Sequence, residues 1–122
     1  MENRQHINQL GLEVHDSVQR YDELVARFSR MRGVTRITEG RGFGSSGQLK
    51  FEGRIFAMLV RGELVLKLPR GRVDELVGAG EGTRFDAGKG KPMHEWFVLS
   101  SASRKQWAAL AQEALKFVQE AK

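Results

Sequence analysis

The sequence has no cysteine among its 122 residues and no long hydrophobic run. The lack of cysteine excludes disulfide bridges, thiolate zinc sites and a cysteine nucleophile. The longest apolar run, Ile55–Val60, is too short to cross a bilayer, and the polar stretch Met1–Gln9 has no signal-peptide core. We therefore expect a cytoplasmic protein with no membrane partner.

Residues that catalyse reactions or bind metals are also scarce. The three histidines, His6, His15 and His94, are not spaced as metal ligands on a helix. No nucleophile elbow, Ser/His/Asp grouping or catalytic pair of carboxylates stands out. We predict that the protein is not an enzyme, with no catalytic residue, no metal and no cofactor. A weaker alternative is an enzyme or small-ligand binder that works at the loop from Phe85 to Trp96.

Two glycine-rich segments superficially resemble phosphate-binding loops. Gly42–Gly47 has G-x-G-x-x-G spacing, but the alternating residues Gln48–Glu52 that follow indicate a strand, whereas a dinucleotide-binding loop opens a helix. Gly88–Pro92 lacks the spacing of a P-loop. We interpret both segments as glycine-rich turns, so neither predicts a bound nucleotide.

Basic residues gather in one part of the sequence. The net charge is +5, and 11 basic but only 3 acidic residues lie between Arg27 and Arg72. A basic stripe attracts phosphates, although arginines at strand edges also prevent edge-to-edge association. Few aromatic residues interleave with these charges, so base stacking is weakly supported. The candidate surface for a nucleic acid or a protein partner comprises Arg36, Arg41, Lys50, Arg54, Arg61, Lys67, Arg70 and Arg72.

Hydrophobic periodicity predicts helices at both ends of the chain and strands between them. After Ser17, an apolar stripe predicts a helix that Gly33 ends. Ser103 and Gln106 match a capping box that opens the last helix. The apolar stripe of this helix comprises Trp107, Leu110, Ala111, Ala114, Leu115 and Val118. Four extended segments, which we count as about three strands, lie at Val34–Glu39, Gln48–Glu52, Arg54–Val60 and Glu63–Leu68. A short helix within Gly71–Gly80 and two short strands, Thr83–Asp86 and Glu95–Leu99, follow.

The predicted fold class is α+β, in the order α-β-β-β-α-β-β-α, with a mostly antiparallel sheet and helices packed on it. Gly53 and the pair Arg61-Gly62 are typical of tight turns between antiparallel strands. We expect residues 1–15 to form a flexible leader and residues 16–122 to form a single domain.

Two stretches of the sequence resemble the TfoX N-terminal domain family. The first combines Phe43-Gly44 with Phe51–Val60 and Leu64–Pro69. The second, Gly80–Trp96, resembles the family's F-D-x-G-x-G-x-x-M-x-E-W signature. The resemblance runs from about Tyr21 to Val118, and the related YjbR-like family shares a similar plan.

This resemblance implies the α-β-β-β-α-β-β-α fold and a link to the regulation of competence genes, since full-length TfoX proteins act as transcriptional co-regulators. The motif residues become candidates for a binding surface or for a structural corner, of which we favour the corner. They are Phe43, Gly44, Phe85, Asp86, Gly88, Met93 and Trp96. We predict a non-enzymatic regulatory or adaptor-like binding module with a protein partner. The alternative is a small protein that binds DNA or RNA directly through a basic strand face.

Overall fold

A computed structural model describes residues 17–37, 47–86, 90 and 92–121. The predicted leader, residues 1–15, lies outside the described residues. The described chain starts with a helix over residues 17–28, called the first helix below. The later elements are β1 (Val34–Ile37), β2 (Gln48–Phe51), β3 (Arg54–Val60), β4 (Glu63–Lys67), α2 (Arg70–Gly78), β5 (Gly82–Phe85), β6 (Met93–Leu99) and α3 (Trp107–Glu120).

The strands form one six-stranded sheet in the order β1-β2-β3-β4-β6-β5, with every neighbouring pair antiparallel. The predicted α+β class, a mostly antiparallel sheet with helices packed on it, is confirmed. The element order differs in one respect, because four strands rather than three precede α2. Each of the four extended segments expected before α2 forms a strand of its own, because a tight turn separates β2 from β3 and another separates β3 from β4.

Both of these turns contain two residues with positive φ. The φ angles are 48° and 85° at Glu52 and Gly53, and 51° and 81° at Arg61 and Gly62. Positive φ at both central residues is what a two-residue type I′ hairpin turn requires, and glycine adopts it without a steric cost. The two turns predicted from Gly53 and Arg61-Gly62 are therefore confirmed.

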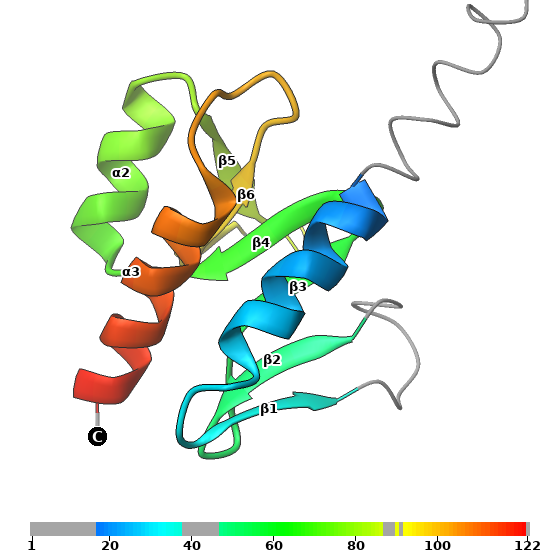
Figure 1. Ribbon diagram of the computed structural model, residues 1–122. Helices are drawn as coiled ribbons and strands as arrows, with labels where there is room; N and C mark the ends of the chain where they lie inside the picture. Colours follow the sequence, from blue (N-terminus) through cyan, green and yellow to red (C-terminus); the bar gives the residue numbers. More distant parts are fainter. Residues whose placement is uncertain (1–16, 38–46, 87–89, 91, 122) are drawn as a thin grey trace, which may run out of the picture.

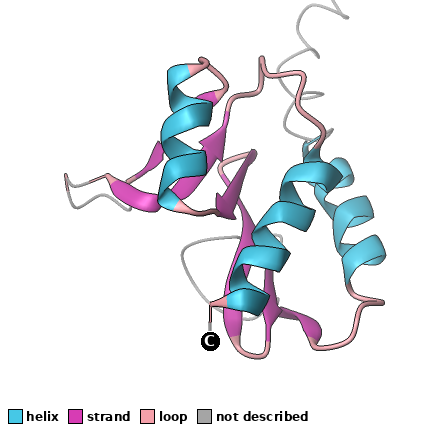
Figure 2. Ribbon diagram, turned by 90° about the vertical axis from the view of Figure 1, so that its left-hand side faces the viewer, coloured by secondary structure: helices cyan, strands magenta, loops and turns pink. Residues whose placement is uncertain are grey.

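The described helices cover one face of the sheet, and α3 lies between α2 and the first helix (Figures 1 and 2). Their apolar side chains join those of the strands in a single core, where the rings of Phe28 and Phe56 lie 6.1 Å apart. The predicted apolar stripes are confirmed in both long helices. Their buried residues are Tyr21, Leu24, Val25 and Phe28 in the first helix, and Leu110, Ala111, Ala114, Leu115 and Val118 in α3.

The opposite face of the sheet carries a smaller apolar cluster. Val65 alternates with Leu64 and Leu66 along β4, so its side chain points away from the main core. It is fully buried and packs with Met58 and Phe85, which are nearly buried. Partly buried side chains surround this cluster, namely Ile55, Val60, Trp96 and Val98.

The start of α3 differs from the sequence prediction. The helix begins at Trp107, and no side chain caps its first amides. The Ser103 hydroxyl instead donates to a Glu81 carboxylate oxygen at 2.6 Å and accepts a hydrogen bond from the Lys105 amide at 3.1 Å. The capping-box prediction is wrong because Ser103 lies in the turn before the helix, where Glu81 and the local backbone engage it.

Tyr21 ties the first helix to the sheet through a buried hydrogen bond. Its side chain is fully buried, and its hydroxyl donates to the Gly47 carbonyl oxygen at 2.9 Å, with the Ala57 carbonyl oxygen at 3.4 Å. Burial raises the pKa of Tyr21 well above its ordinary value of 10.0, against a smaller opposing effect of Arg36. The phenol therefore stays neutral for as long as the helix remains packed on the sheet.

Replacing Tyr21 by Phe is expected to lower the free energy of unfolding by about 1–2 kcal/mol, because a buried carbonyl loses its donor. In the wild type, this free energy should also fall as the pH rises above 10.0, since only the unfolded chain then ionises its tyrosine. Urea unfolding at a series of pH values measures both effects. In Tyr21→Phe, the free energy of unfolding should fall less above pH 10.0 than it does in the wild type.

The chain contains one tyrosine, so tyrosinate absorbance reports Tyr21 alone. We expect this absorbance to increase only together with unfolding. Ionisation at pH 10 in a chain that keeps its helical circular dichroism would contradict the buried hydrogen bond.

Candidate functional site

The predicted basic surface does not form one continuous stripe. Arg41 lies outside the described residues. Arg61 lies in the turn between β3 and β4, at the opposite end of that hairpin from Arg54 and Lys67. Arg36 extends from β1 toward the first helix and pairs with Asp22 at 3.2 Å. These placements leave the other five basic residues near the start of β3 and the end of β4.

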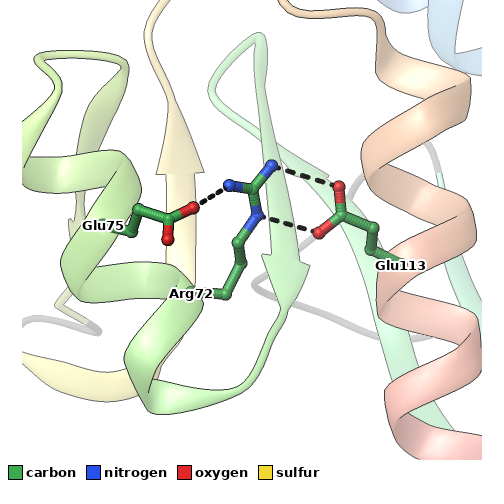
Figure 3. A network of polar contacts seen from close by, with 3 residues as sticks. All are labelled: Arg72, Glu75 and Glu113. Carbon is green, nitrogen blue, oxygen red and sulfur yellow. Dashed lines mark hydrogen bonds and ion pairs between the residues drawn. The ribbon is translucent and has the colours of Figure 1, made fainter.

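Arg72 is occupied by a network that joins α2 to α3 (Figure 3). Its Nε and Nη2 atoms donate to the two carboxylate oxygens of Glu113 at 2.9 and 3.2 Å, and Nη1 donates to Glu75. The hydrogen bond to Glu113 is the main cause that raises the pKa of Arg72 above its ordinary value. Because Nε, Nη1 and Nη2 of Arg72 all donate to carboxylates, few of its N–H groups are left for a phosphate. Arg72 therefore links α2 to α3.

A second ion pair fixes α2 to the edge of the sheet. Arg84 of β5 donates to Asp74 of α2 at 2.5 Å. This hydrogen bond is the main reason that the pKa of Asp74 lies below its ordinary value, and Arg70 contributes a smaller share. Arg84 therefore takes part in the fold and does not extend the candidate surface.

Three of the remaining basic residues, Lys50, Arg54 and Lys67, line a concave region of about 690 Å³, which we call the basic hollow. Its charged lining residues are Lys50 of β2, Arg54 of β3, Lys67 of β4 and Glu95 of β6. Its apolar lining residues are Ile55, Trp96, Phe117 and Val118, of which the last two come from the end of α3. The volume falls within the range of about 300–1,000 Å³ that is usual for ligand pockets.

An irregularity in the sheet lies beside this hollow, since Lys50 and Ile55 line it and form the pair next to the irregularity. Between β2 and β3 the register shifts, so that Leu49 faces Ala57, Lys50 faces Ile55, and Phe56 has no partner. This β-bulge places Phe56 beside Ala57 in the main core and bends the start of the strand. The pairing of β3 with β4 runs from Val60 to Ala57 and stops at the bulge. The end of α3 and the side chain of Trp96 line the space that opens there.

Lys67 contacts two other residues that line the basic hollow, Glu95 and Trp96. Its Nζ lies 3.3 Å from a Glu95 carboxylate oxygen and 5.2 Å from the centre of the Trp96 ring. An ammonium over an indole face is a cation–π contact, and it fixes the position of the lysine. Arg54 is also positioned, because its Nη1 donates to the carbonyl oxygen of Ala121 just after α3.

A shallower hollow of about 350 Å³ adjoins the first and shares Lys67, Glu95 and Trp96 with it. Arg70 and the exposed Met93 line it, and Met93 is the one large hydrophobic residue exposed among those the structure describes. Trp96 therefore lies between two cavities. Within the described residues, neither Lys50 nor Arg70 has a carboxylate at ion-pair distance.

The family-motif residues fall into separate environments. Trp96 and Met93 line the hollows, whereas Phe85 is buried in the smaller apolar cluster and Asp86 is exposed beside it. Phe43, Gly44 and Gly88 lie outside the described residues. The structure thus joins two motif residues with Lys50, Arg54, Lys67 and Arg70 from the predicted basic surface.

The contribution of α3 to the hollow was not predicted from the sequence. Phe117 and Val118 are adjacent, so only Val118 belongs to the predicted core stripe of that helix. Phe117 is partly buried beside this stripe. The one sequence signal for this contribution was the position of Phe117, a large aromatic residue at the border of an amphipathic stripe.

Other classes of site find little support in the described part of the chain. It contains no group of three or more histidine, aspartate or glutamate side chains that could hold a metal ion. None of its helices combines the length and the hydropathy needed to span a bilayer.

Comparisons with protein-family models, with curated proteins and with solved structures find no match.

Replacing Arg72 by Ala is expected to lower the free energy of unfolding by about 1–2 kcal/mol, because Glu113 and Glu75 lose their shared partner. The matched control is Lys116→Ala, which removes a cation from an exposed position of α3 and should change stability by less than about 0.5 kcal/mol. Urea unfolding measures both variants. Equal effects would contradict the bridging role of Arg72.

Proposed function

We propose that this chain is a non-enzymatic regulatory or adaptor-like module that binds a protein partner at the basic hollow. The observation that carries the proposal is a concave apolar surface with basic side chains at its border. Lys50 at this border, and Arg70 in the adjoining shallower hollow, have no carboxylate partner within the described residues. Such a surface is suited to an acidic partner that also contributes apolar contacts.

The lining of the hollow supports binding rather than catalysis. Here the charged groups are Lys50, Arg54, Lys67 and Glu95, and the last two form an ion pair with each other. The three cationic side chains, Lys50, Arg54 and Lys67, offer positive charge and hydrogen-bond donors, so recognition of an anion is the role that we assign to them.

The resemblance to the TfoX N-terminal domain family favours a regulatory role for this binding. Trp96 and Met93, which carry part of that resemblance, line the two hollows. We therefore assign these two residues to a binding surface in this proposal. We also place the module in the cytoplasm, where a chain without cysteine has no need of an oxidising environment.

A protein partner fits the surface better than a nucleic acid does. A phosphate backbone is held chiefly by several unpaired cations along one face. Arg36 and Arg72 are held by carboxylates, and Arg61 lies at the far end of the β3–β4 hairpin. The partly buried apolar residues at the hollow, in contrast, suit apolar side chains.

One observation favours direct nucleic-acid binding as a second candidate function. Trp96 is partly buried and lies beside Lys67 and Arg70, and an aromatic ring flanked by cations can stack an unpaired base. This arrangement would bind single strands more readily than duplexes.

The protein-partner proposal predicts that reversing the charge of Lys50 and Arg70 abolishes binding. The double variant Lys50→Glu/Arg70→Glu should lose the proteins that the immobilised wild type retains from extracts of its source cells. The control Arg30→Glu/Lys116→Glu makes the same change in net charge at exposed positions outside the hollows and should retain them. Identical sets of retained proteins for both variants would contradict the proposed surface.

The nucleic-acid candidate makes a different prediction. Random-sequence single strands and duplexes should bind at about 50 mM salt, and the affinity should fall steeply as salt rises, because phosphate contacts release counterions. Fluorescence anisotropy of labelled oligonucleotides measures this. Absence of binding at the lowest salt concentration removes the second candidate.

A further inference from the structure

We propose that the segment recognised by the basic hollow is a short acidic peptide with one large apolar side chain between its carboxylates. The inference rests on the proposed function and adds the chemistry of the partner. The apolar side chain enters the hollow, and the carboxylates on its two sides meet Lys50 and Arg54 at one end and Lys67 and Arg70 at the other.

The lining of the hollow provides the place for the apolar side chain. Ile55, Trp96 and Phe117 are each partly buried and come from three elements, β3, β6 and α3. They remain partly open to solvent although the main core of the molecule is closed. A leucine or phenylalanine side chain would cover them and release the water that contacts them.

The positions of the cations determine where the carboxylates lie. Lys50 and Arg54 flank the turn between β2 and β3, on one side of the hollow. Lys67 lies on the other side, next to Arg70 of the adjoining shallower hollow, and Trp96 lines both cavities. Arg54 uses Nη1 for the Ala121 carbonyl oxygen, which leaves other guanidinium N–H groups for a carboxylate.

Glu95 gives this arrangement a distinctive property. Its carboxylate is 3.3 Å from Lys67 Nζ and about half exposed, so it occupies a position that a peptide carboxylate would also seek. An incoming carboxylate must share Lys67 with Glu95 and is repelled by its charge. Neutralising Glu95 should therefore strengthen peptide binding, an effect that a purely structural ion pair would not produce.

A second copy of this chain is a poorer occupant than an acidic peptide. The chain carries a net charge of +5, so two copies repel each other, and the hollow itself is bordered by cations. Charge complementarity thus favours an anionic segment. Nucleic acid shares that charge and is distinguished from a peptide by the experiment.

Binding can be followed through the fluorescence of Trp96. The chain has two tryptophans, and the variant Trp107→Phe leaves Trp96 as the one indole, with circular dichroism confirming that this background stays folded. The probe is a capped heptapeptide with a central leucine between two Glu-Asp-Glu triplets. A matched peptide carries alanine in place of the leucine, and a single-stranded oligonucleotide serves as competitor.

The leucine peptide is expected to bind saturably and to change the Trp96 emission. The alanine peptide should bind about tenfold more weakly, because it buries far less apolar surface. Lys50→Glu/Arg70→Glu should weaken binding of the leucine peptide by about tenfold or more. Glu95→Gln should strengthen it by about two- to fivefold, in line with a partly exposed pair of charges.

Equal affinity for the leucine and alanine peptides, or unchanged affinity in Glu95→Gln, would overturn this inference. So would an oligonucleotide that binds more tightly than the peptide and displaces it. If the peptide fails to bind but charge reversal still removes the retained proteins, the inference is wrong and the proposed module stands. If both fail, the proposed function is wrong as well.

Discussion

The architecture depends on the burial of a single face of an antiparallel sheet beneath helices. Residues of the helices and strands meet in one core on that side, where Tyr21, Phe56 and Phe97 are fully buried. Because this core holds most of the buried apolar residues, the other side of the sheet keeps only a small cluster around Val65. Side chains at the ends of the strands therefore lie outside the core and can carry charge.

Much of the fold follows from local patterns that one strand or helix displays by itself. Two kinds of feature were predictable, namely the apolar stripes of the first helix and α3 and the turns at Gly53 and Gly62. Both depend only on residues within a short stretch of sequence, because they follow from hydrophobic periodicity or from a positive φ angle. The number of strands before α2 was predicted less well. Four extended segments were counted as about three strands, whereas each of them forms a strand. Ser103 shows the limit of a motif, because Glu81, far from it in sequence, takes up the hydroxyl that a helix cap would need.

The candidate site was less predictable, because it depends on contacts between distant residues. A list of basic residues does not show that Arg72 faces Glu113 or that Arg36 faces Asp22, and both pairings engage a cation that the predicted surface included. Nor does alternation along β3 show the register shift that leaves Phe56 unpaired. Phe117 joins the hollow only because the end of α3 reaches the strands at that shift.

The bulge at Phe56 has an evolutionary consequence. A β-bulge is one additional residue in one strand, and the pairs on both sides of it keep regular antiparallel partners. A regular hairpin acquires such a bulge through the insertion of a single codon, without any change in the helices that secure the core. Most residues around the hollow lie outside the main core, so substitutions at these positions spare the packing that secures the scaffold.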